Sequence, residues 1–235
     1  MSIVRGITVT WLGHSTFKVT SVDGKSLLID PWLTGNPRCP EGEKVQSDID
    51  LMLCTHGHFD HIGDAVATAK AASPTVVGIF ELCSWMERKG VTNTAPMNKG
   101  GSVRLGDITV TMVHADHSCG ITEDDGSIVY GGEAVGYVIE FENGFRLYHA
   151  GDTAVFGDMK LIGDLYRPDL AMLPIGDRFV MSPREAALAA RLLGVSTVIP
   201  MHFGTFPLLT GTPDALRAEN SELQVVELEP GQTLR

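Results

Sequence analysis

Short stretches of alternating apolar and polar residues open the chain. A period of two is typical of a half-buried β-strand. It predicts strands over Ile7–Trp11 and Phe17–Thr20, and the more apolar Ser26–Ile29 follows a predicted hairpin turn at Asp23-Gly24. We therefore expect the chain to begin with three short strands.

The rest of the chain mixes such segments with helical patterns. Further strands are predicted over Leu51–Cys54, Thr75–Ile79, Val103–Leu105, Ile108–Val113, Val135–Phe141, Phe145–Tyr148, Asp169–Leu173, Thr197–Pro200 and Gln224–Leu228. Helices are predicted over Ile62–Ala72, Phe80–Lys89, Ser182–Leu193 and Pro213–Ala218. Ser182 and Glu185 predict a capping box, and Asn143-Gly144 predicts a hairpin. Thr34–Gln46 and Ser118–Gly132 are expected to be loops.

The sequence shows no linker, low-complexity segment or domain boundary, so we predict a single domain over residues 1–235. Strand meanders broken by helices occur roughly twice along it. This arrangement predicts an α+β fold in which two mixed sheets pack face to face with helices outside.

Composition narrows the classes of function. The formal charge of −11, with no basic run, argues against a nucleic-acid partner. No signal peptide and no membrane-spanning stretch are recognised, and the four scattered cysteines fit reduced thiols, so a cytoplasmic location is expected. We expect a small-molecule substrate, and a homo-oligomer is the default expectation.

The stretch Thr55–His61 carries the clearest chemistry, with four metal-binding side chains at the spacing H-x-H-x-D-H. Alternation along an extended chain places His56 and His58 on the same side, whereas Asp60 and His61 begin the next helix and point elsewhere. One loop can thus supply ligands to two neighbouring ions. A merely polar loop is the alternative, but three of the eight histidines lie here. Zinc, iron, manganese and nickel suit such ligands.

Histidine or aspartate recurs near the ends of three later strands, at His117, Asp152 and His202. Each alone could be structural. Loops at one edge of a sheet are common places for functional sites. With the first cluster these residues make seven candidate ligands, enough for two ions that share a bridging group.

Several motifs also match a known family. They are the H-x-H-x-D-H stretch, Trp11–Thr16, Ala115-x-His117-Ser118, Tyr148–Thr153 and Leu173–Asp177. The chain resembles the metallo-β-lactamase superfamily over essentially its whole length. Within that superfamily it is similar to uncharacterised metal-dependent hydrolases that resemble ascorbate-6-phosphate lactonase. The resemblance implies a four-layer αββα sandwich with the metals at one edge.

The resemblance also assigns the ligands. It implies one ion bound by His56, His58 and His117, a second bound by Asp60, His61 and His202, and Asp152 between them. His14 lies in a motif that the resemblance places near the metals, so it is expected to contact substrate or orient a ligand. Asp177 is a candidate for orienting a ligand histidine. Arg178 departs from the small polar residue expected there.

Two histidines are left over. His149 precedes Gly151-Asp152 on a predicted strand, and we expect a structural role. His114 lies three residues before His117 and should face the opposite way.

Two divalent ions, zinc first and manganese, nickel or iron as alternatives, predict hydrolysis. Cations about 3.5–4 Å apart lower the pKa of a bridging water from about 15.7 to about 7. Asp60 can accept its proton, and the second ion can polarise a carbonyl. An ester-like bond is the expected target, and the resemblance suggests a lactone. Alternatives are phosphodiester, thioester or amide hydrolysis, an iron-dependent redox enzyme, and a metal-stabilised binding protein without turnover.

Overall fold

The three N-terminal strands form part of a seven-stranded sheet in the computed structural model, which describes residues 2–235. In spatial order this first sheet contains β16 (Thr233–Leu234), β1 (Thr8–Trp11), β2 (Phe17–Thr20), β3 (Ser26–Ile29), β4 (Leu51–Leu53), β5 (Thr75–Ile79) and β6 (Thr94–Met97). The first three pairings are antiparallel and the last three are parallel. The predicted turn at Asp23-Gly24 joins β2 to β3, with Gly24 at φ +85°.

A second seven-stranded sheet repeats this arrangement. In spatial order it contains β7 (Ser102–Leu105), β8 (Ile108–His114), β11 (Val135–Glu140), β12 (Arg146–His149), β13 (Leu170–Pro174), β14 (Thr197–Met201) and β15 (Gln224–Val225). Again three antiparallel pairings precede three parallel ones. The internal repetition predicted from the strand pattern is therefore present in the fold.

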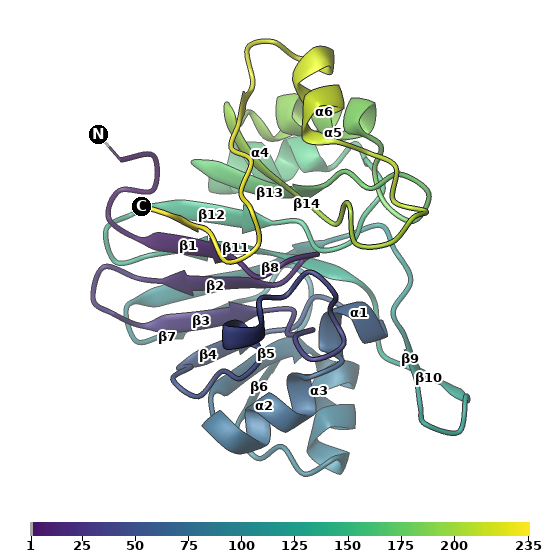
Figure 1. The fold of residues 1–235 in the computed structure, drawn as a ribbon. Coiled ribbons are helices and arrows are strands. Elements are labelled where there is room, and N and C mark those ends of the chain that lie inside the picture. Colours follow the sequence, from purple (N-terminus) through teal and green to yellow (C-terminus); the bar gives the residue numbers. More distant parts are fainter. Residues whose placement is uncertain (1) are drawn as a thin grey trace.

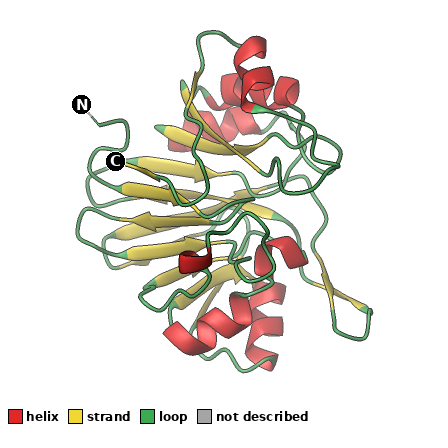
Figure 2. Cartoon of the chain, viewed as in Figure 1, coloured by secondary structure: helices red, strands yellow, loops and turns green. Residues whose placement is uncertain are grey.

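The two sheets pack face to face around one hydrophobic core, and the helices lie outside (Figures 1 and 2). The helices are α1 (Phe59–Ile62), α2 (Ala65–Ala72), α3 (Phe80–Arg88), α4 (Met159–Tyr166), α5 (Pro183–Leu193) and α6 (Pro213–Glu219), with a 3-10 turn at Glu41–Glu43. The α2 and α3 helices lie beside β4 to β6, and α4 to α6 lie beside β13 and β14 (Figure 1). This confirms the αββα sandwich.

A hydrogen bond across the core fixes the sheets to each other. The hydroxyl of Tyr137, on β11, donates to the carbonyl of Cys54, which directly follows β4, at 2.7 Å. Both residues are completely buried. The residue directly before the Thr55–His61 stretch is therefore held by the opposite sheet. Among residues 2–235, no helix is long and apolar enough to cross a bilayer.

The predicted helix Ile62–Ala72 is wrong in its bounds. The chain turns helical earlier, at Phe59, and breaks at Gly63 and Asp64 before α2. The Asp64 carboxylate accepts hydrogen bonds from the backbone N–H groups of Leu33 and Thr34, at 2.6 and 3.0 Å. The backbone N–H of Asp64 donates to the Pro31 carbonyl at 2.9 Å, so the helical hydrogen-bond pattern is interrupted there.

Several short elements were not predicted. β6 contains Pro96, which weakens a strand signal and is tolerated because β6 lies at the edge of its sheet. Ser118–Gly132, expected to be a loop, contains the hairpin β9 (Gly120–Thr122) and β10 (Ile128–Tyr130), which projects from the body (Figure 1). The α4 helix and β16 were also missed, and the last predicted strand is shorter than expected.

The predicted capping box of Ser182 and Glu185 is present.

Candidate metal centre

Six loops meet at one edge of the sandwich, and each follows a strand. They place His14 after β1, Asp30 after β3, the His56–His61 segment after β4, His117 after β8, Asp152 after β12 and His202 after β14. Because neighbouring parallel strands end at the same edge of a sheet, ligands from distant parts of the sequence converge there. The seven predicted ligands all lie in this region and form overlapping clusters.

The first cluster contains three histidines. One ring nitrogen from each of His56, His58 and His117 lies within 4.8 Å of the others. His56 Nε2 and His58 Nδ1 are 2.9 Å apart, so the two side chains do share one side of the loop. His56 is fully buried, while His58 and His117 are partly exposed. This cluster therefore faces the solvent side of the centre.

Hydrogen bonds orient the His56 ring. The Thr55 hydroxyl donates to Asp30 Oδ2 at 2.7 Å, so it accepts from His56 Nδ1 at 3.0 Å. The proton of a neutral His56 ring therefore lies on Nδ1. Its Nε2 keeps a lone pair that points into the cluster.

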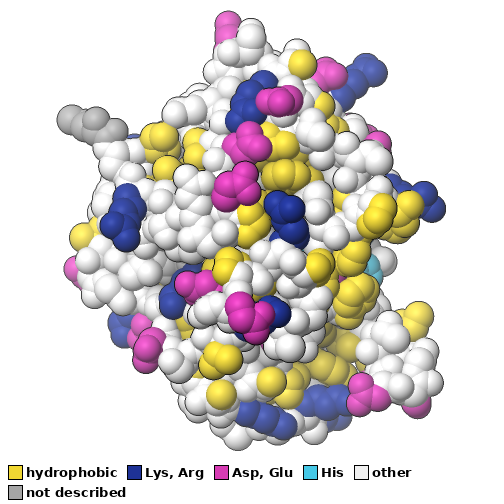
Figure 3. All heavy atoms as spheres, in the orientation of Figure 1, with side chains coloured by type: hydrophobic (Ala, Val, Ile, Leu, Met, Phe, Trp, Pro, Cys, Tyr) yellow, Lys and Arg dark blue, Asp and Glu magenta, His cyan; other side chains and the backbone are white. Residues whose placement is uncertain are grey.

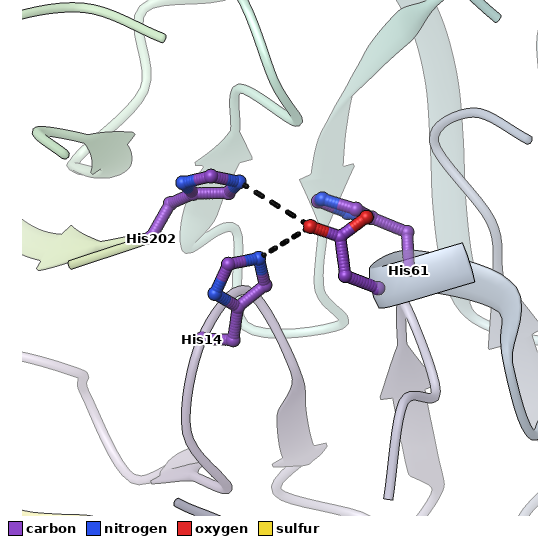
Figure 4. Close-up of side chains that lie close together, drawn as sticks. His14, His61 and His202 are labelled. Atoms are coloured by element: carbon purple, nitrogen blue, oxygen red, sulfur yellow. Dashed lines mark hydrogen bonds and ion pairs between the residues drawn. The ribbon is translucent and has the colours of Figure 1, made fainter. Parts of the chain in front are cut away.

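The second cluster brings together His14, Asp60, His61 and His202, again within 4.8 Å (Figure 4). His61 Nδ1 donates to Asp30 Oδ2 at 2.8 Å, which aims Nε2 at the centre. A carboxylate that receives the other N–H of a ligand histidine is a common feature of metal sites. Asp30 thus orients His61 directly and His56 through Thr55.

Asp152 lies between the two clusters. The Nε2 atoms of four histidines surround its Oδ2 atom. They belong to His202 at 2.9 Å, His61 at 3.2 Å, His117 at 3.7 Å and His56 at 3.9 Å. Two of these histidines come from each cluster. A single carboxylate oxygen at the junction of two ligand sets is the arrangement expected of a bridging ligand.

The buried polar atoms test whether metal ions fit these residues. Within residues 2–235, Asp152 Oδ1 is buried and has no hydrogen-bond partner, and the buried His61 Nε2 and His202 Nε2 lie 3.2 and 2.9 Å from Asp152 Oδ2 without forming a hydrogen bond of good geometry. Buried polar atoms without partners are costly. A cation between these atoms would satisfy them, and imidazole with carboxylate is a usual donor set for divalent transition metals. The residues therefore fit metal ions.

The electrostatics divide the histidines into two groups. Burial lowers the pKa of His56, His58 and His117, so these rings are neutral and ready to bind a cation. Burial by itself also lowers the pKa of His61, but the carboxylates of Asp152 and Asp30 outweigh it and raise that pKa well above its usual value.

Both aspartates of the centre remain ionised at neutral pH. Burial alone raises the pKa of Asp60, but the hydrogen bond from His14 and the charge of His61 lower it to about 2. Burial also opposes ionisation of Asp152, and the His202 and His61 imidazoles hold its pKa well below the usual range. The centre thus keeps two carboxylates available for cations.

His14 holds Asp60 in place. Its Nε2 lies 3.1 Å from Asp60 Oδ2, and its Nδ1 lies 3.0 Å from the Thr205 hydroxyl. Burial and the charge of His202 lower the pKa of His14 to about 4, so the ring carries one proton. Because the Asp60 carboxylate can only accept, that proton lies on Nε2 and the Thr205 hydroxyl donates to Nδ1. His14 therefore orients the candidate base.

Asp177 does not reach the centre. Its carboxylate is exposed and accepts from the backbone N–H of Arg178 at 2.8 Å, and within the described chain it pairs with no histidine. The prediction that it orients a ligand histidine is wrong, because Asp30 has that contact instead. The sequence signal that could have identified Asp30 is an aspartate directly after the wholly buried strand β3.

The remaining histidines lie outside both clusters. His149 is buried, accepts from the backbone N–H of Gly151 at 3.1 Å and donates to the Ser15 carbonyl at 3.2 Å. These contacts fit the structural role expected for it. His114 is exposed and contacts Lys99 and Phe156, away from the ligands, as predicted.

A pocket of about 540 Å³ opens onto the centre. Its floor consists of candidate ligands, among them His58, Asp60 and His202. Its walls are apolar and are formed by Phe59, Phe179, Phe206, Pro207 and Leu208. In the space-filling view, a histidine surfaces among hydrophobic side chains at the right-hand edge (Figure 3).

Comparison with known proteins agrees with this description. The family model for the beta-lactamase superfamily domain matches residues 25–203. A UPF0173 metal-dependent hydrolase from Koribacter versatilis is 58% identical over 230 residues, which cover 98% of both chains. Another from Rubrobacter xylanophilus is 54% identical over 236 residues, which cover 99% of this chain and 98% of that one.

A solved structure is also similar. Igni18, described as a novel metallo hydrolase from the archaeon Ignicoccus hospitalis, matches with a TM-score of 0.85 at 34% identity and covers 97% of both chains. The chain therefore belongs to the metallo-β-lactamase superfamily, together with the UPF0173 metal-dependent hydrolases, and it is a metal-dependent hydrolase. The family predicted from the motifs is confirmed.

Proposed function

We propose that this protein is a dinuclear hydrolase that cleaves an ester-like bond in a small molecule, with zinc as the first expectation for both ions. One ion would be held by His56, His58 and His117. The other would be held by Asp60, His61 and His202, and Asp152 would contact both ions. The observation that carries the proposal is the convergence of four imidazole nitrogens on Asp152 Oδ2.

The ions and the protein have separate tasks. When bound, divalent cations supply acidified water at neutral pH and polarise a carbonyl oxygen. The ionised Asp60, held by His14, accepts a proton at its carboxylate. Thr55 and Asp30 keep the His56 and His61 rings aimed at the centre. The partly exposed His58 and His117 border the pocket through which a substrate reaches these groups.

A lactone is the lead substrate because of the motif resemblance. Phosphodiesters, thioesters and amides are the alternatives on the same site. The net charge of −11 and the absence of lysine and arginine from the residues lining the pocket disfavour a polyanionic substrate. The cytoplasmic location and a homo-oligomeric state stay predictions.

The decisive experiment is metal analysis by plasma emission on protein purified without chelator, for the wild type and for His117→Ala and His202→Ala. We expect about two zinc ions per chain in the wild type and about one in each variant. The matched control is His114→Ala, which removes an exposed histidine three residues from His117 and should leave the metal content unchanged. One ion or none in the wild type would contradict the dinuclear proposal, and iron would favour a redox enzyme.

Activity completes the test. Zinc-loaded protein should hydrolyse lactones faster than matched phosphodiesters, thioesters and amides. Asp60→Asn should lower this rate by about 10²–10⁴, the usual contribution of a general base. Turnover unchanged by Asp60→Asn would show that this carboxylate is not the base.

A further inference from the structure

We infer that the pocket above the metal centre selects substrates whose ester or lactone group carries a neutral apolar substituent, such as an alkyl chain or an aryl ring. This inference rests on the proposed function. It concerns the part of the substrate that does not react, and it follows from the pocket walls, whereas the proposed function follows from the floor.

The walls collect apolar side chains from three separate segments. Phe59 lies within the H-x-H-x-D-H stretch at the start of α1, Phe179 follows β13, and Phe206, Pro207 and Leu208 follow β14. A soluble protein seldom gathers exposed apolar groups at one point without a binding role. Of these side chains, Phe59 is 62% exposed, Phe179 51% and Leu208 47%.

Packing holds part of this surface in place. Phe206 stacks on Trp32 with ring centroids 5.7 Å apart, and Trp32 meets Phe59 edge-on at 5.8 Å. Trp32 is buried. The apolar wall is thus a preformed surface backed by the core, as is usual for small-molecule pockets.

The distribution of charged residues around the pocket also favours a neutral substituent. The polar atoms that line it belong to the candidate ligands and to Ser118, and no lysine or arginine belongs to the lining. Arg178 lies beside the pocket, with its guanidinium over the Phe179 ring at 5.6 Å. Lys18 and Arg184 line other surface hollows. The lining thus offers no partner for a phosphate on the substrate.

Alkyl hydroxamates of increasing length test the inference without turnover. Their head group chelates metal, and their tail extends into the pocket. Calorimetry on the zinc-loaded protein should show affinity rising roughly two- to fourfold per added methylene from acetohydroxamate to octanohydroxamate. Phe179→Ser and Leu208→Ser should each reduce the ratio of long-chain to short-chain affinity by roughly three- to tenfold and leave acetohydroxamate binding unchanged.

Leu165→Ser is the matched control because Leu165 is a 70% exposed leucine on α4, outside the pocket. It should leave every affinity unchanged. Thermal unfolding of all three variants checks that they fold, which is expected because each side chain is about half exposed or more.

The outcomes separate the two proposals. If acetohydroxamate binds and a longer chain adds nothing, the apolar substrate class is wrong and the metal centre stands. If neither compound binds, the metal centre itself is wrong, and the inference falls with it. Faster hydrolysis of a phosphorylated lactone than of an alkyl lactone with the same ring would also overturn the apolar substrate class while supporting the hydrolase.

Discussion

The two sheets have the same succession of strand pairings, yet they supply the metal centre differently. In each sheet the fourth strand in spatial order, β3 or β12, is followed by an aspartate. Both oxygens of Asp30 accept hydrogen bonds from the protein, from Thr55 and His61. Asp152 Oδ1 has no partner in the described chain, and its Oδ2 faces four imidazoles. The two aspartates at equivalent positions therefore differ in role, because Asp30 orients candidate ligands whereas Asp152 is itself a candidate ligand.

The second and fifth strands repeat the contrast. The loop after β1 carries His14, which binds Asp60, whereas the loop after β8 carries His117, which belongs to the three-histidine cluster. The loop after β4 supplies four candidate ligands, but the loop after β13 leaves Asp177 in solvent. The first half therefore concentrates its candidate ligands in one loop, and the second half contributes single residues whose role depends on their neighbours.

The largest effect is expected from Asp152→Asn. It weakens the one oxygen that both clusters share, so both ions should be lost and the rate should fall by about a thousandfold or more. Metal analysis and an ester assay check this. A variant that keeps two ions would show that Asp152 does not bridge.

A smaller effect is expected from Asp30→Asn, at the equivalent position of the other sheet. Residues that orient a metal ligand typically contribute about 10- to 100-fold in metal affinity or activity. Competition with a fluorescent chelator measures the affinity. Asp177→Asn, after the fifth strand of the second sheet, should change it less than about twofold. Equal losses in Asp30→Asn and Asp152→Asn would remove the proposed division of roles.

His14→Ala should leave two ions bound and lower the rate by about tenfold. It removes the hydrogen bond that lowers the pKa of Asp60 to about 2, so burial should raise that pKa. Because the base must be ionised, the acidic limb of the pH–rate profile should move to higher pH in the variant. An unmoved limb, with an unchanged rate, would exclude this role of His14.

The smallest expected difference is in the protonation states of the histidines in the metal-free protein. At pH 7 we expect His61, held between Asp30 and Asp152, to be protonated, because its pKa is raised. His56, His58 and His117 should be neutral because their pKa values are lowered. Imidazole nitrogen chemical shifts in chelator-treated protein report both states. A neutral His61 at pH 7 would contradict the assignment.

Local sequence determined much of this protein. Alternation located most strands, the capping box of Ser182 and Glu185 fixed the start of α5, and Asn143-Gly144 marked a hairpin. The spacing H-x-H-x-D-H indicated one loop of candidate ligands because its residues are neighbours along the chain. Short-range signals are reliable where a strand period or a turn residue decides the structure locally.

Tertiary structure decided the rest. Asp30 and Asp177 look alike in the sequence, since each lies just past a buried strand. Only the packing of β3 beside β4 brings Asp30 to Thr55 and His61, while Asp177 turns to solvent. The apolar pocket likewise joins Phe59, Phe179 and Leu208 from distant parts of the sequence. A residue's role here depends on which donors and ions surround it, and long-range contacts set those surroundings.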